Sequence, residues 1–188
     1  MSIMEEDEMK ATGIVRRIDD LGRIVVPKEI RRTMRIREGD PLEIFTNREG
    51  EIMLKKYSPI GELSEFASGY AESIAATTGK LVCITDRDYV IAAAGPKKKE
   101  FEGKPLDVSL TELIDGRKTM VASKKENNLI KITADDEKDF FAEAMTTIIS
   151  SGDTIGSVVI CGKDENWQPD AMKQIAQTAA QFLGRQME

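Results

Sequence analysis

Hydrophobic positions in the first part of the chain fall into short runs typical of strands, with one short helix among them. ATGIVRRI at residues 11–18 is rich in β-branched side chains and predicts a strand that ends at the turn-forming DDLG of residues 19–22. IVV at residues 24–26 is wholly apolar and predicts a short strand buried on both faces. Pro27 suits the first position of a helix, so KEIRRTMR at residues 28–35 predicts two helical turns.

The next two apolar runs predict a β-hairpin. LEIFT at residues 42–46 and EIMLKKY at residues 51–57 flank the turn sequence Asn47-Arg48-Glu49-Gly50. The strands, helix and hairpin together form a unit of about fifty residues. A unit of that length buries at best about 60% of the surface of its unfolded chain, which makes it marginally stable as a monomer. Because this stretch carries neither a disulfide nor a metal site, we expect an obligate dimer that exchanges strands between chains.

The pattern changes at Tyr57-Ser58-Pro59, which predicts a domain junction. We therefore expect an unstructured leader at residues 1–8, a first domain at 9–57 and a second at 58–188. Helical spacing in the second domain predicts helices at residues 60–76, 109–122 and 169–187, and apolar runs predict strands at 80–95 (two, around Asp86-Arg87-Asp88), 128–133, 140–150 and 154–162. The last two strands form a predicted hairpin around Ser151-Gly152-Asp153. This order of elements predicts an α+β fold.

The last predicted helix carries a narrow apolar seam. Its members are spaced 3-4-3-4, which suits packing against another helix: Met172, Ile175, Ala179, Phe182 and Gln186.

Charge is divided unevenly along the chain. Residues 1–8 carry four acidic and no basic side chains, and residues 9–58 carry twelve basic and eight acidic ones. Residues 59–188 carry fifteen basic and twenty-one acidic side chains, so the net charge of −6 conceals a basic N-terminal domain. Such an asymmetry is typical of a nucleic-acid surface joined to another domain.

The composition argues against an enzyme. The chain has no histidine, which excludes Ser-His-Asp and Cys-His nucleophiles and a histidine-ligated zinc site, so we expect no catalytic residue, metal or cofactor. Cys83 and Cys161 lie far apart in apolar runs and are typical of buried thiols in a cytoplasmic protein. No apolar run is long enough to span a bilayer, and the acidic start MSIMEEDE lacks the features of a signal peptide.

Basic residues in the N-terminal domain predict a surface for double-stranded DNA. Lys28, Arg31, Arg32 and Arg35 recur at i, i+3, i+4 and i+7 on one side of the predicted helix. Ile30 and Met34 take the opposite side, and we expect them to face the core. The rigid guanidinium fork binds phosphates and guanine edges in bidentate geometry. The candidates also include basic residues before and after the DDLG turn, and the full set is Lys10, Arg16, Arg17, Arg23, Arg31 and Arg32. A single short helix after a strand does not make a helix-turn-helix.

The run TGIVRRIDDLGRIVVPKEIRRTMRIREGDPLEIF, followed by EIMLKKY, resembles the DNA-binding domain of the AbrB family of transition-state regulators over residues 9–57. The resemblance implies a swapped-hairpin β-barrel dimer. It also implies DNA contacts at Arg16, Arg23, Arg31 and Arg32. Antitoxins of the same superfamily offer an alternative function, but they carry a short acidic tail that binds the toxin, whereas residues 59–188 show the pattern of a folded domain.

The helix–strand–helix order of the second domain, with the ending FLGRQME, is similar to sporulation regulators of this family that add a GAF-like domain. That resemblance implies tetramerisation through the C-terminal helices, activation and repression of genes in the developing forespore, and a nucleoid-associated, cytoplasmic location. A GAF-like fold also implies a pocket for a small ligand, with Cys83, Ile84, Ile91 and Val159 from the strands and the loop segment 95–106 as its candidate lining. Lys97-Lys98-Lys99 could bind an anionic ligand in this pocket, but such a run more often forms a solvated surface, and we favour that interpretation.

Overall fold

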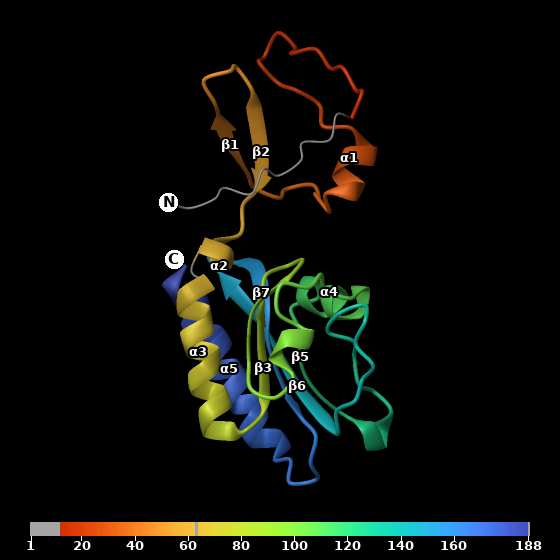
Figure 1. Ribbon diagram of the computed structural model, residues 1–188, viewed down its shortest axis with the longest axis vertical. Coiled ribbons are helices and arrows are strands. Elements are labelled where there is room, and N and C mark those ends of the chain that lie inside the picture. The colour runs from red at the N-terminus through yellow and green to blue at the C-terminus, as the bar shows by residue number, and fades with distance from the viewer. Residues whose placement is uncertain (1–11, 63, 188) are drawn as a thin grey trace. The chain divides into compact units, whose positions relative to one another are not determined.

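The computed structural model describes residues 12–62 and 64–187, and contacts divide the chain into two compact units, Met1–Leu42 and Glu43–Glu188 (Figure 1). In the first unit, residues 12–26 form no helix or strand, although their β-branched side chains predicted two strands. Val25 is 71% exposed rather than buried on both faces. A strand needs a partner for its backbone groups, and this single chain supplies none to these segments.

The helix of the first unit is shorter than predicted. Helix α1 spans Lys28–Thr33, and Pro27 is its N-cap instead of its first residue. Arg35 has a φ of 52°, which is a left-handed conformation, so it lies beyond the helix and does not extend the basic stripe of Arg31 and Arg32. Met34, predicted to face the core, is 56% exposed.

The predicted hairpin is confirmed at the start of the second unit. Strands β1, Leu42–Thr46, and β2, Ile52–Lys56, form a two-stranded sheet. The Asn47 side-chain oxygen closes the turn by accepting hydrogen bonds from the backbone N–H groups of Glu49 and Glu51. Most residues of both strands are exposed, and no closed barrel forms among the described residues of the single chain.

A five-stranded antiparallel sheet in the order β4-β3-β7-β6-β5 organises the remainder of the chain. Its strands are β3 (Leu81–Thr85), β4 (Val90–Ala94), β5 (Thr119–Ser123), β6 (Ala142–Ser150) and β7 (Asp153–Gly162). The predicted hairpin around residues 151–153 is confirmed as β6–β7, whose turn holds Ser151 and Gly152 at positive φ. Glycine is favoured there because such a backbone conformation crowds a Cβ.

Helices cover both faces of this sheet. Helices α3, Ser64–Thr78, and α5, Pro169–Gln186, lie side by side on one face, and α4, Val108–Asp115, lies on the other (Figure 1). The short helix α2, Pro59–Glu62, precedes α3, and the 3-10 turns η1, Lys98–Glu100, and η2, Lys124–Glu126, belong to the connections. Each face buries its own apolar cluster, one under α3 and α5 and one under α4 and the loops.

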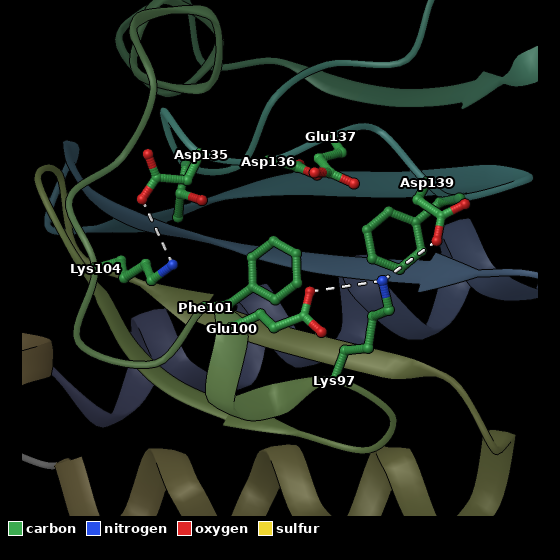
Figure 2. Close-up of a pocket in the computed structure, with 10 residues that line it drawn as sticks. Lys97, Glu100, Phe101, Lys104, Asp135, Asp136, Glu137 and Asp139 are labelled. Carbon is green, nitrogen blue, oxygen red and sulfur yellow. Dashed lines mark hydrogen bonds and ion pairs between the residues drawn. The ribbon is translucent and has the colours of Figure 1, made fainter.

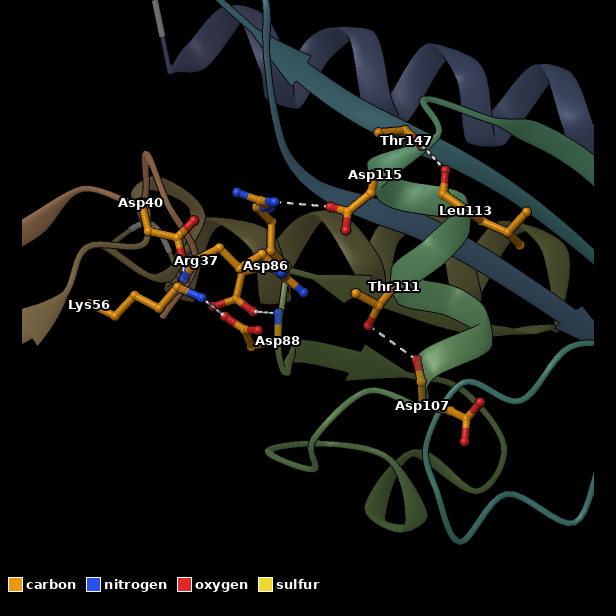
Figure 3. Close-up of polar contacts among 11 residues, drawn as sticks. Arg37, Asp40, Lys56, Asp86, Asp88, Asp107, Thr111, Leu113, Asp115 and Thr147 are labelled. Atoms are coloured by element: carbon orange, nitrogen blue, oxygen red, sulfur yellow. Dashed lines mark hydrogen bonds and ion pairs between the residues drawn. The ribbon is translucent and has the colours of Figure 1, made fainter. Parts of the chain in front are cut away.

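Two predictions in this domain were wrong. The helix expected over residues 109–122 ends at Asp115, because Arg117 adopts a positive φ of 54° and the chain then enters β5. The Asp107 side chain caps the start of α4 by accepting from the backbone N–H of Ser109. The Asp107 carbonyl oxygen accepts from the Thr111 hydroxyl group in the same turn (Figure 3). Residues 128–133, predicted as a strand, form none and make only an isolated bridge, Leu106 to Thr133.

Candidate nucleic-acid interface and ligand cavity

A tight turn before α1 holds Arg23 in place. One Asp19 carboxylate oxygen accepts from the backbone N–H groups of Leu21, at 3.0 Å, and Arg23, at 2.8 Å, and the other oxygen meets Arg23 Nε at 2.8 Å. The backbone hydrogen bond from Arg23 and the Arg23 side chain hold the pKa of Asp19 below its usual value. The Arg23 side chain remains 68% exposed, so its terminal nitrogens face solvent.

The other predicted arginines also lie in the first unit. Arg16 and Arg17 are exposed on the extended segment before the turn, Arg32 is exposed on α1, and Arg31 is half-buried beside it. Among the described residues, none of these four guanidinium groups forms an ion pair with a carboxylate, and Arg31 Nε is buried without a hydrogen-bond partner. Lys10 lies outside the described residues. The exposed guanidinium groups of Arg16, Arg17 and Arg32 are therefore available to bind phosphate oxygens.

The four strand residues predicted to line a ligand pocket fall on two faces of the sheet. Cys83 and Val159 pair across β3 and β7 and belong to the cluster under α4. Ile84 belongs to the cluster under α3 and α5, against which Ile91 also packs. Because successive strand residues point to opposite faces, these four side chains do not line one pocket.

The structure instead shows a polar cavity of about 290 Å³ on the face covered by α4 (Figure 2). Phe101 and Phe140, with ring centroids 6.0 Å apart, form its apolar part. Lys97 and Lys104 lie at its edge, and each is paired with a carboxylate: Lys97 Nζ is 3.2 Å from Asp139 Oδ2, and Lys104 Nζ is 3.6 Å from Asp135 Oδ2. Because Asp139 neutralises the charge of Lys97, this lysine does not offer an uncompensated positive charge to an anionic ligand.

The acidic run DDEKD at residues 135–139 supplies much of this cavity, and it was not among the predicted site residues. Asp136 is 6% exposed, and its two oxygens accept from the backbone N–H groups of Ile132 and Lys138, both at 2.9 Å. A buried carboxylate of this kind fixes a loop by replacing the partners that a strand would supply. The only sequence signal was five charged residues immediately before two phenylalanines.

A second buried carboxylate anchors the same loop. Glu143 on β6 is 1% exposed, its Oε2 accepts from the backbone N–H of Ile130 at 3.1 Å, and its Oε1 has no hydrogen-bond partner among the described residues. Burial raises the pKa of Glu143 to about 7, the Ile130 hydrogen bond opposes this rise, and the charge of Asp136 adds to it. Lys138 also opposes the rise.

This burial predicts a stability that depends on pH. The folded-state pKa of Glu143, about 7, lies above its ordinary value of 4.5, so the folded protein binds the proton more tightly than the unfolded chain. The resulting stability is fully present below pH 4.5 and is lost as the pH rises through 7. The free energy of unfolding in urea should fall by up to about 3 kcal/mol between pH 5 and pH 8.

The variant Glu143→Gln should remove most of that dependence, because the amide accepts from Ile130 and never ionises. The variant Glu137→Gln, at an exposed neighbour of the cavity, should keep it. Since the chain has no histidine, few other side chains titrate in this range. If Glu143→Gln and the unaltered protein lose stability equally between pH 5 and pH 8, Glu143 is not the titrating group.

The two thiols lie in the same cluster and are poor candidates for catalysis. Cys83 is 0% exposed and Cys161 is 2% exposed. Burial raises the pKa of both thiols, and the charge of Asp136 raises that of Cys83 further. Because the thiolate is the nucleophile, such thiols are unreactive near neutral pH.

Among residues 12–62 and 64–187, no group of three histidine, cysteine or acidic side chains is arranged to hold a metal ion. The helices of the described part of the chain are also too short or too polar to cross a membrane.

Comparison with known sequences and structures places both parts of the chain. The family described as "Stage V sporulation protein T C-terminal, transcription factor" matches residues 62–188, and "Antidote-toxin recognition MazE, bacterial antitoxin" matches residues 15–62. Stage V sporulation protein T of Bacillus subtilis (strain 168) is 48% identical over 96% of this chain and 99% of its own length. The transition state regulatory protein AbrB of the same organism is 46% identical over 39% of this chain and 76% of its own length.

A solved structure extends the comparison to the fold. The GAF domain of an Acinetobacter phosphoenolpyruvate-protein phosphotransferase superposes with a TM-score of 0.55 at 11% identity, covering 71% of this chain and 84% of that one. At this identity the likeness shows a shared GAF fold alone. The family follows from the 48% identity over nearly the whole of both chains and from the match to residues 62–188. The chain is a member of the stage V sporulation protein T family of transcription regulators, with an AbrB-type N-terminal domain and a GAF-like C-terminal domain.

Proposed function

We propose that this protein is a DNA-binding transcription regulator, both activator and repressor, of sporulation genes in the developing forespore. The observation that carries this proposal is the 48% identity to stage V sporulation protein T over nearly the whole of both chains. The solvent-facing arginines support it, because they supply the cations that a phosphate backbone requires. The proposed DNA-binding set is Arg16, Arg17, Arg23, Arg31 and Arg32, and it also includes Lys10, which lies outside the described residues.

The DNA-binding form is a homodimer built through residues 9–57. Apolar side chains in this stretch are far more exposed than a finished core allows: Val15 is 86%, Val25 71% and Leu21 69% exposed. Burying each such side chain contributes about 1.5–3 kcal/mol. A second copy that adds its strands to the β1–β2 hairpin covers these side chains and also supplies the partner that residues 12–26 lack.

Two such dimers join through α3 and α5 to make a homotetramer. Phe66, Tyr70 and Phe182 form an aromatic cluster across these helices, with Tyr70 and Phe182 centroids 5.2 Å apart and Phe66 and Phe182 centroids 5.9 Å apart. Phe66 and Phe182 are each 39% exposed, and an apolar groove on the same two helices adjoins Tyr70. Exposed aromatic side chains beside a groove are typical of a protein–protein interface.

The antitoxin function is the second candidate, because residues 15–62 match the MazE family. An antitoxin of that type uses a short tail after its DNA-binding domain, and in this chain the hairpin is followed by a five-stranded domain with two buried clusters. We therefore favour transcription regulation. The GAF-like domain senses a small ligand in the cavity lined by Phe101, Phe140 and the 135–139 run.

The proposal is tested by titrating the full chain into labelled duplex DNA at several salt concentrations. If each subunit of a dimer neutralises about three phosphates, the logarithm of the binding constant should fall against the logarithm of salt concentration with a slope near −5. Selection of bound fragments from a random duplex library would then define the preferred site. A chain that binds no duplex at low salt is not a DNA-binding regulator.

A further inference from the structure

A basic segment interrupts the otherwise acidic C-terminal domain. Residues 116–131 carry five basic side chains and one acidic side chain, whereas residues 59–115 and 132–188 together carry ten basic and twenty acidic ones. The segment includes β5, which forms one edge of the five-stranded sheet. Four of its basic residues are exposed, two before β5 and two after it, and we name them the β5 ridge: Arg117, Lys118, Lys124 and Lys125.

The charges of the β5 ridge are not neutralised by the protein. Among the described residues, none of the four forms an ion pair, whereas elsewhere in the domain Lys80, Lys97 and Lys163 all do. Arg117 donates one guanidinium N–H to the Gly152 carbonyl oxygen at 2.7 Å, and Lys125 Nζ lies 5.5 Å from the centroid of the Phe141 ring. Both contacts orient a side chain and leave its charge uncompensated.

The spacing of the β5 ridge suits an extended polyanion. Lys118 and Lys124 are six residues apart across an edge strand, which at the rise of a strand is about 20 Å. Double-stranded DNA carries one charge per about 1.7 Å of its axis, so the two ends of the ridge span several phosphates.

The connection between the domains adds a second argument. Only Tyr57 and Ser58 separate β2 from α2, so DNA held by the N-terminal domain stays at a high local concentration for the C-terminal domain. The acidic surfaces of that domain are repelled by DNA, and the β5 ridge is attracted to it. We infer that the β5 ridge is a second contact surface for double-stranded DNA, which lengthens the footprint of the protein. This inference rests on the DNA binding proposed above.

The two 3-10 turns of the domain provide a matched test. Lys124-Lys125-Glu126 in η2 belongs to the β5 ridge, and Lys98-Lys99-Glu100 in η1 has the same sequence outside it. The double variant Lys124→Gln/Lys125→Gln is compared with Lys98→Gln/Lys99→Gln in the full chain, and each removes two charges. Fluorescence anisotropy follows binding to a duplex of roughly 12 base pairs, little more than one helical turn, and to a long duplex with the same centre.

Each lost phosphate contact reduces the magnitude of the salt slope by about 0.9. On the long duplex, the ridge variant, Lys124→Gln/Lys125→Gln, should therefore have a salt slope smaller by about 1.8 for each subunit that contacts DNA. Its affinity at low salt should fall about tenfold, and the η1 variant should match the unaltered protein. On the short duplex all three proteins should bind alike.

Equal behaviour of the ridge variant and the unaltered protein on the long duplex overturns the inference, and so does an equal loss in both variants. If the ridge variant loses binding only to a polyglutamate probe, the surface belongs to an acidic protein partner and the inference fails. If the unaltered protein does not bind the short duplex, the proposed function fails instead. Failure of this inference and failure of the proposed function are therefore distinguishable.

Discussion

Replacing Phe182 with aspartate should halve the mass of the assembly, from four chains to two. Phe182 is 39% exposed and stacks on Tyr70 at the surface shared by α3 and α5. In the proposed tetramer this surface meets a copy of itself. A carboxylate introduced there is removed from water without a cation to pair with, which costs several kcal/mol.

The expected loss is large because the interface is symmetric. Each substituted residue occurs on both sides of a two-fold contact, so its cost is counted twice. Loss of the phenylalanine burial alone, at about 1.5–3 kcal/mol for each side, weakens the association of dimers by a factor of at least about 100. Light scattering on a size-exclusion column measures the mass directly.

The control is Gln181→Asp, which places the same charge one position earlier on α5. Gln181 is exposed and does not belong to the aromatic cluster. The two variants share any effect of a carboxylate near the C-terminal end of α5, where the helix dipole disfavours it. A tetramer retained by Phe182→Asp, or lost equally in both variants, would show that α3 and α5 do not form the contact between dimers.

The C-terminal fold was predictable from the sequence where two apolar runs are adjacent in the chain and pair with each other as strands. The β6–β7 hairpin joins two apolar runs through Ser151-Gly152, and these runs and turn residues predicted it. The register shift between Ile148 and Ile149 has no counterpart in that pattern. The first domain was not predictable for a single chain. Residues 12–26 have strand composition, but the structure gives them no partner, and we propose that the partner is a second chain. A sequence records the preference for a strand and does not record which chain supplies the neighbouring one.

The loop over residues 128–139 shows a different limit of sequence reasoning. NLIKIT has the composition of a strand, but the backbone N–H groups of Ile130 and Ile132 donate to Glu143 and Asp136. Side-chain carboxylates therefore replace a neighbouring strand. No periodicity in the segment reveals this substitution, because the acceptors lie beyond its end. The prediction of a helix over residues 109–122 was wrong for a local reason, because the chain turns at Gly116-Arg117.

The candidate site was only partly accessible from the sequence. Arg23 and Arg32 were predicted from the basic charge of the segment together with its resemblance to the AbrB family. Both are exposed in the structure, and DNA contact by them stays a prediction. The alternation of side chains along a strand is enough by itself to put Cys83 and Ile84 on opposite faces of β3. Half of the cavity was within reach, because its 97–104 part lies in the 95–106 loop that was predicted to line a pocket. The 133–140 part was not, because only the fold brings that segment beside the loop.

Replacing Arg23 with alanine should reduce the affinity for duplex DNA about 100-fold. The Arg23 terminal nitrogens face solvent while Asp19 holds its Nε, so the guanidinium is presented at a fixed angle for a phosphate or a guanine edge. A contact of this kind contributes about 1–3 kcal/mol, and a dimer makes it twice. The magnitude of the salt slope should also fall by about 2.

This substitution is informative because the turn should survive it. The backbone of Arg23 stays bound to Asp19 through its N–H, at 2.8 Å, and its carbonyl oxygen, at 3.0 Å, and neither bond uses the side chain. The control is Arg48→Ala, which removes an exposed guanidinium from the β1–β2 turn. Arg48 is not in the proposed interface, so its variant should bind with unchanged affinity. If Arg23→Ala and the unaltered protein bind duplex DNA with equal affinity and unfold at the same temperature, Arg23 does not belong to the DNA-binding surface.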